Sequence, residues 1–150
     1  MLIIGIILGI IVILAILAII YKNKFVILDN RVKNSWSQID VQMQNRFSLV
    51  PNLVETVKGY AKHEKDTLEG ISNAKTKYMS ASTTEEKMEA NNQLNGLLGK
   101  LFAISEAYPE LKANTSFEKL QTQLVEIEDK IRFARQFYND TVTEYNQAIQ

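Results

Sequence analysis

The sequence predicts an all-α membrane protein, in which a single transmembrane helix precedes a four-helix up-and-down bundle with long first and last helices. Four observations lead to this prediction. Residues 2–20 form an uninterrupted apolar run, and apolar residues then recur every three or four positions through most of the remaining chain. No alternating strand pattern competes with them. All 17 basic and 17 acidic side chains lie outside the apolar run.

The apolar run contains ten Ile, four Leu, two Ala, two Gly and one Val. A helix of this length extends about 28 Å, close to the ~30 Å of a bilayer's hydrocarbon layer. A signal peptide would need a basic segment before a shorter apolar core and a small-residue cleavage site, and the sequence has neither. A core helix that is apolar on every side would need a large surrounding protein. We therefore expect a retained transmembrane helix over residues 1–21.

A short basic joint over residues 22–24 follows the span. Lys22, Lys24, Arg31 and Lys33 lie close to the end of the apolar run, whereas no basic residue precedes it. The positive-inside rule then places the C-terminal domain in the cytoplasm of a bacterial cell, with the chain crossing the cell membrane once. Insertion as an ordinary signal anchor would give the opposite orientation, and this alternative stays open.

The bundle domain is expected over residues 25–150 and begins with a long amphipathic helix. Its apolar stripe has an average step of 3.6 residues. The stripe consists of Phe25, Leu28, Val32, Trp36, Ile39, Met43, Phe47, Val50, Val54, Val57 and Ala61. Because the stripe keeps its phase across Pro51, we expect a kink there and a break near residues 59–63. The lack of glycine and proline over residues 21–24 predicts that the span and this helix are nearly one rod.

Two shorter helices are expected next. The first covers residues 64–79 and buries Leu68, Ile71 and Tyr78, and residues 80–84 form a loop. Thr83 and Glu86 match a capping box at the start of the following helix, which ends near Glu106 before Pro109. That helix buries Met88, Leu94, Leu97, Leu98, Leu101 and Phe102.

The final helix shows the most regular pattern. Thr115 and Glu118 match a second capping box, which predicts the start of this helix. Its apolar positions alternate steps of three and four, as is typical of shallow left-handed helix packing. They are Phe117, Leu120, Leu124, Ile127, Ile131, Ala134, Tyr138, Thr141, Tyr145 and Ala148.

Residues for catalysis or cofactor binding are scarce, so we predict no enzyme activity, no cofactor and no metal site. The chain has no cysteine and a single histidine, His63. A zincin motif would need a second histidine at Thr67, and every catalytic triad would need His63. The neutral charge balance and the lack of a basic stripe argue against nucleic acid as a partner.

Two glycines in the span suggest an association between membrane helices. Gly5 and Gly9 form a small-xxx-small motif, which lets two spans approach closely. A second copy of this chain is therefore one candidate partner, beside the lipid bilayer and proteins that the sequence does not identify.

Several segments together resemble the LemA family of bacterial membrane proteins, and the likeness covers essentially the whole chain. The matching segments are Trp36-Ser37, Ile39 to Gln42, Leu49 to Tyr60, His63-Glu64, Glu106 to Asn114, Phe117, Leu120-Gln121, Glu128, Ile131, Ala134-Arg135, Tyr138 to Asp140 and Tyr145-Asn146. The resemblance implies an N-terminal span, a helical-bundle domain and no established enzyme activity. Family members usually continue into a proline-containing tail, so we expect that this chain lacks one.

Two interpretations of the matching residues stay open. Trp36, Arg46, Asn139 and Asn146 are our candidates for a partner-binding groove. Alternatively, the motif residues serve the fold, with Trp36 filling the core and Asn114 shaping a turn.

Our main functional hypothesis is a non-catalytic interaction or scaffold protein anchored in the membrane. The alternative is an envelope sensor or a regulatory subunit of a membrane enzyme or transporter. A metal- or small-ligand-binding bundle is a third, weaker class.

Overall fold

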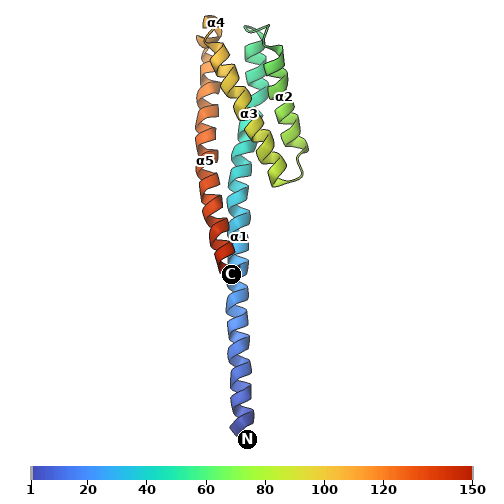
Figure 1. The fold of residues 1–150 in the computed structure, drawn as a ribbon. Coiled ribbons are helices and arrows are strands. Elements are labelled where there is room, and N and C mark those ends of the chain that lie inside the picture. The colour runs from blue at the N-terminus through green and yellow to red at the C-terminus, as the bar shows by residue number, and fades with distance from the viewer. Residues whose placement is uncertain (1, 150) are drawn as a thin grey trace. The chain divides into compact units, whose positions relative to one another are not determined.

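The computed structural model describes residues 2–149 and contains five helices over that range (Figure 1). They are α1 (Leu2–Lys58), α2 (Lys65–Ser80), α3 (Thr84–Ser105), α4 (Pro109–Lys112) and α5 (Thr115–Ile149). No strand occurs among the described residues, which confirms the all-α class. The chain divides into a first unit, Met1–Ile39 with Arg132–Gln150, and a second unit, Asp40–Ile131.

Helix α1 is continuous from the apolar run into the amphipathic stripe. Within it, an 18-residue window has a mean hydropathy of 3.5 and is 0% buried, so this segment is long and apolar enough to cross a membrane. No break occurs over residues 21–24, as expected. Helix α1 also continues past Pro51, because only one backbone donor is lost there.

The first unit consists of the N-terminal part of α1 and the C-terminal part of α5. Arg31 Nη1 lies 3.4 Å from a carboxylate oxygen of Glu144. The rings of Trp36 and Tyr138 meet edge to face with centroids 5.8 Å apart. Both pairs set α5 antiparallel to α1 in this unit. Leu28 is buried between these contacts and the span.

The second unit has a core to which all five helices contribute. The stripe of α1 is buried here as the sequence predicts, and α2 packs against α3. Its largest fully buried side chains are Phe47, Phe117, Met43, Leu53, Ile71, Leu94, Leu98, Leu101, Leu111, Leu124 and Ile131. On α5, every predicted apolar position in both units is buried or half-buried. Sequence periodicity therefore identified the core-facing side of each long helix.

The predicted helix boundaries hold within one or two residues. Helix α1 ends at Lys58, and the connection to α2 carries the exposed His63. The Thr83–Glu86 capping box is confirmed: the amide of Glu86 donates to Thr83 Oγ1 at 3.2 Å, and the amide of Thr83 donates to Glu86 Oε2 at 3.1 Å. These hydrogen bonds satisfy donors that the first turn of α3 would otherwise leave free.

The second predicted capping box is wrong. Thr115 is already helical, and the residue before it supplies the cap: the amide of Phe117 donates to Asn114 Oδ1 at 3.0 Å. Asn114 is a strong capping residue, and its Nδ2 also donates to the Tyr60 hydroxyl at 3.0 Å. This second contact ties the start of α5 to the connection between α1 and α2, which no local pattern reveals.

The short helix α4 was not predicted. Pro109 occupies its first turn, where a missing backbone donor costs nothing, and Leu111 is fully buried. The segment between α3 and α5 is therefore a packed helical turn.

Candidate functional site

The described residues contain no group of three or more His, Cys, Asp or Glu side chains that could hold a metal ion. The polar features of the second unit are instead two side-chain clusters and a groove.

The first cluster, the Arg46 cluster, consists of Arg46, Asn91, Asn95 and Glu128. Arg46 is 3% exposed, and its Nη1 donates to Asn91 Oδ1 at 3.0 Å and to Glu128 Oε2. Its Nη2 donates to Asn95 Oδ1, and Asn95 Nδ2 donates to Glu128 Oε1 at 2.8 Å. Burial lowers the pKa of Arg46, while the charge and hydrogen bond of Glu128 act in the opposite direction. The cluster thus joins α1, α3 and α5 through one buried charge.

Two donors in this cluster have no partner. Arg46 Nε and Asn91 Nδ2 are both buried without a hydrogen bond. An unpaired buried donor costs about 1–3 kcal/mol, so the cluster is a compromise and not an optimised network. The guanidinium donates in fixed directions to side chains on α3 and α5. These hydrogen bonds therefore favour one packing register of α1 against both helices.

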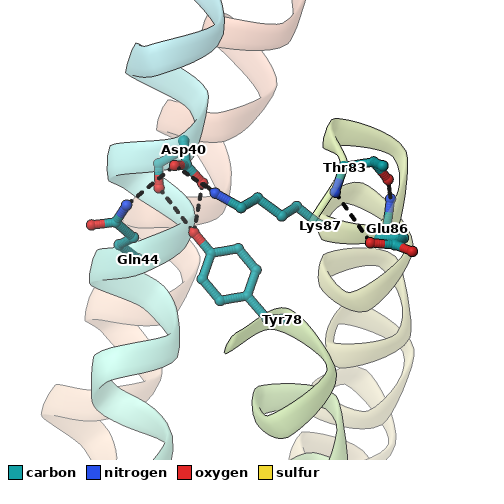
Figure 2. A network of polar contacts seen from close by, with 6 residues as sticks. All are labelled: Asp40, Gln44, Tyr78, Thr83, Glu86 and Lys87. Atoms are coloured by element: carbon teal, nitrogen blue, oxygen red, sulfur yellow. Dashed lines mark hydrogen bonds and ion pairs between the residues drawn. The ribbon is translucent and has the colours of Figure 1, made fainter. Parts of the chain in front are cut away.

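The second cluster, the Asp40 cluster, joins α1, α2 and α3 (Figure 2). The Tyr78 hydroxyl donates to Asp40 Oδ1 at 2.7 Å, and Lys87 Nζ donates to Asp40 Oδ2 at 2.9 Å. Gln44 Nε2 donates to the same carboxylate at 3.2 Å. The Tyr78 ring also stacks on Phe47 with centroids 4.3 Å apart.

The Asp40 carboxylate is the anionic centre of this cluster. Partial burial acts to raise the pKa of Asp40, but the hydrogen bonds from Lys87 and Tyr78 and the charge of Lys87 outweigh burial and lower it. For Tyr78, burial and the hydrogen bond to Asp40 raise the pKa. The carboxylate is therefore charged and the phenol neutral at neutral pH, which is a structural arrangement and not an acid–base pair.

A third feature is a groove between the end of α1 and α2, which we call the lysine groove. Two hollows of 370 and 520 Å³ form it and share Val54, Lys58 and Ser72. Its apolar lining is Val50, Pro51, Val54, Ala61 and Leu68, and its charged lining is Glu55, Lys58, Lys62, Lys65, Glu69 and Lys75.

Lysines outnumber carboxylates around the lysine groove although the whole chain is neutral. Lys65 and Glu69 form an exposed pair at 3.6 Å, which contributes little to stability. The apolar lining is mostly buried in the core, so the accessible character of the groove is its basic rim, which suits a segment that carries carboxylates.

The four residues of the predicted partner-binding groove fall in different units. Arg46 is buried in the second unit, whereas Trp36, Asn139 and Asn146 belong to the first. Trp36 is half-buried against Tyr138, and the two asparagines are exposed. Gly5 and Gly9 lie on the exposed span, where an added Cβ would meet no atom within 4 Å.

Most members of the two clusters were not singled out by the sequence. Asn91 and Asn95 offered one signal, since they repeat at four-residue spacing beside the apolar face of α3. Asp40 and Glu128 lie in segments that carry the family resemblance, but nothing local shows which residues they meet.

The exposed apolar helix and the helical units together define a membrane-anchored, all-helical protein. Within that class the chain belongs to the LemA family, whose family model matches residues 35–150. Protein LemA of Metamycoplasma hominis is 26% identical over 85% of this chain and 59% of its own length. Magnetosome protein MamQ 2 of Paramagnetospirillum magneticum and magnetosome protein MamQ of Magnetospirillum gryphiswaldense are each 26% identical over 85% of this chain and 56% of their own length.

The comparisons agree with the membrane and transmembrane character of the chain, and none of these names describes an enzymatic reaction. The chain spans less than two thirds of the length of these curated relatives. The similarity to these relatives therefore does not by itself assign an activity or a partner to the whole protein.

Proposed function

We propose that this chain is a non-catalytic interaction or scaffold protein, which the span holds at the bacterial cell membrane. One observation carries the proposal: the apolar segment of α1 is 0% buried, and the same helix continues into the packed second unit. Such an exposed apolar surface is stable only in lipid or against other apolar surface. The described polar clusters join helices to each other, which is a structural task.

The finer architecture belongs to the same proposal. The buried stripes and the short connections support a four-helix up-and-down bundle built from α1, α2, α3 and α5. The C-terminal domain faces the cytoplasm, because the basic residues cluster after the span. A reporter fused after Gln150 that is active only outside the cell would contradict this orientation.

The lysine groove is the surface that we propose for a protein partner. The excess of lysine around it favours an acidic partner segment, whose carboxylates would pair with Lys58 and Lys62. The part of α1 that lines the groove, from Val50 to Lys58, is about 12 Å long, which matches about two turns of a helix. The predicted groove at Trp36, Arg46, Asn139 and Asn146 remains a second candidate, and Gly5 and Gly9 remain candidates for packing against a second copy.

Copurification of the intact protein from membranes, with and without envelope stress, tests the proposed role. A constant set of neighbours under both conditions supports a scaffold. Exchange of one regulatory partner on stress would contradict the scaffold role and favour the sensor or regulatory subunit. The relative MamQ 2 is named as a magnetosome protein. For this chain, that name supports a role at a membrane and nothing more specific.

A further inference from the structure

One face of α1 in the first unit is exposed and uncharged along its whole length. We call it the α1 seam, and its members alternate steps of three and four residues. They are Ile6, Gly9, Ile13, Ile16, Ile20, Asn23, Ile27, Asn30, Asn34 and Ser37. All five charged side chains of this part of α1 lie beside the seam and none lies on it, namely Lys22, Lys24, Asp29, Arg31 and Lys33.

The α1 seam lies on the side of the helix away from α5. Leu28 is buried and Trp36 packs against Tyr138 of α5. At 3.6 residues per turn, the centre of the seam is roughly opposite this buried stripe, and Ile27 on the seam is 55% exposed. On the exposed side of α1, the charges therefore lie at the edges, while isoleucine and asparagine occupy the centre. This arrangement differs from an ordinary solvated face, which mixes charged and polar side chains across its width.

The spacing of the α1 seam is that of a coiled coil, in which alternating steps of three and four define positions a and d. The a positions hold four isoleucines and then one asparagine, in the order Ile6, Ile13, Ile20, Ile27 and Asn34. β-Branched residues at a favour two parallel strands, and a single asparagine at a fixes register and oligomeric state. Inside the span, Gly9 at a d position lets two helices approach closely.

A second copy of this chain fits the seam because each seam residue can face its own equivalent. Copies in one membrane share an orientation, so their α1 helices run parallel. In register, a charged seam residue would meet a like charge, whereas an asparagine amide both donates and accepts a hydrogen bond and so matches itself. At the edges, Lys33 would lie beside Gln38 of the second copy. Arg31 would lie beside Val26 of the second copy, so like charges do not meet there either.

We propose that two copies of the chain pair in parallel through the α1 seam, from the span to Ser37. Asn34 lies 14 residues after Ile20, which is about 21 Å along a helix, so it sets the register in water beyond the bilayer. The inference rests on the proposed membrane anchoring, which gives the two copies one orientation. In the paired first unit, α5 lies on the outer side of each α1.

Cysteine crosslinking tests the pairing, since the chain has no native cysteine. The purified full chain is reconstituted in vesicles of phosphatidylcholine and phosphatidylglycerol and treated with a mild oxidant. Ile27→Cys and Asn34→Cys probe the seam. Lys22→Cys, which is exposed on α1 beside the seam, and Gln136→Cys, which is exposed on α5, are the matched controls. We expect several-fold more disulfide-linked dimer from the two seam variants, and a yield that holds when more lipid is added per protein.

Equal yields from seam and control variants, with the chain resistant to alkaline extraction from the vesicles, would overturn this inference alone. Release of the chain by alkaline extraction would contradict the membrane anchoring, and with it the shared orientation.

A second variant tests the register. Asn34→Asp keeps the shape of the side chain but places two carboxylates face to face in the pair. Added to Ile27→Cys, it should lower the dimer yield several-fold, while the circular dichroism stays unchanged because Asn34 is exposed in the single chain. An unchanged yield would place Asn34 outside the contact and overturn the proposed seam.

Discussion

At the scale of the residue, the second unit depends on a few polar side chains that meet across helices. Arg46 is the most constrained of them, because its buried charge contacts α3 and α5 at once. Asp40 plays the matching role for α1, α2 and α3, although water reaches part of it. Both residues convert general apolar packing into one defined arrangement of helices.

Replacing Arg46 by Met should destabilise the protein by about 3 kcal/mol. Loss of one partner of a buried ion pair costs ~3–5 kcal/mol, and the lower end applies because the Glu128 side chain is 35% exposed. Urea unfolding of the full chain in detergent micelles, followed by circular dichroism, measures the change. The exposed Arg135→Met is the matched control, and equal midpoints for the two variants would refute the prediction.

Removing both charges should be less harmful than the single changes imply. In Arg46→Met with Glu128→Leu, neither charge is left without its partner, so the two losses should not add. The same unfolding assay provides the comparison. Simple additivity would show that the ion pair contributes nothing specific.

The Asp40 cluster predicts a loss of stability in acid. The pKa of Asp40 is lower in the folded protein than in the unfolded chain, so folding favours the charged carboxylate. Its contribution is complete above the unfolded pKa of about 3.9 and disappears as the pH falls through the folded value. Asp40→Asn should therefore reduce the difference between urea midpoints at pH 7 and pH 3, whereas the exposed Asp140→Asn should leave that difference unchanged.

At the scale of the element, helix ends show where local and tertiary forces compete. At Thr83 the capping box satisfies the first turn of α3 by itself, and the backbone hydrogen bonds of Ser82 and Thr83 lower the pKa of Glu86. At the start of α5, Asn114 takes the cap from Thr115 and also reaches Tyr60. The cap therefore lies one residue before the predicted position, and the side chain of Asn114 caps α5 in place of that of Thr115.

Replacing Asn114 by Ala should cost about 1 kcal/mol, the usual value for a lost helix cap. The amide proton of Phe117 should then exchange faster with solvent, because it loses its acceptor. Thr115→Ala provides the control and should leave that amide protected. The opposite pattern would restore the capping box at Thr115 and Glu118.

At the scale of the whole molecule, the span, the helical units and the lysine groove define what a partner meets. Charge reversal at Lys58 and Lys62 (Lys58→Glu with Lys62→Glu) should reduce capture of an acidic partner at least tenfold and leave the chain in the membrane. Quantitative crosslinking in membranes measures the capture. Reversal of Lys100 and Lys119, exposed lysines on other helices, is the control, and an equal loss there would assign the effect to net charge.

The sequence by itself determined the four longer helices, their buried faces and the apolar span. Each of these depends on the spacing of apolar residues along one helix, and burial of the stripe from Phe25 to Ala61 follows from that spacing. The fold class was therefore predictable, and so was the confirmed cap at Thr83. Spacing on one helix says nothing, however, about which residues on two helices stand opposite each other.

The tertiary structure alone decided which polar groups meet. Arg46 reaches Asn91 and Glu128, which lie 45 and 82 residues away along the chain, and only the register between helices brings them together. The packing of α1 against α2 likewise formed the lysine groove. Hydrophobic periodicity depends on one helix and the side that it turns to solvent. The contacts between polar side chains depend on how several helices pack against each other.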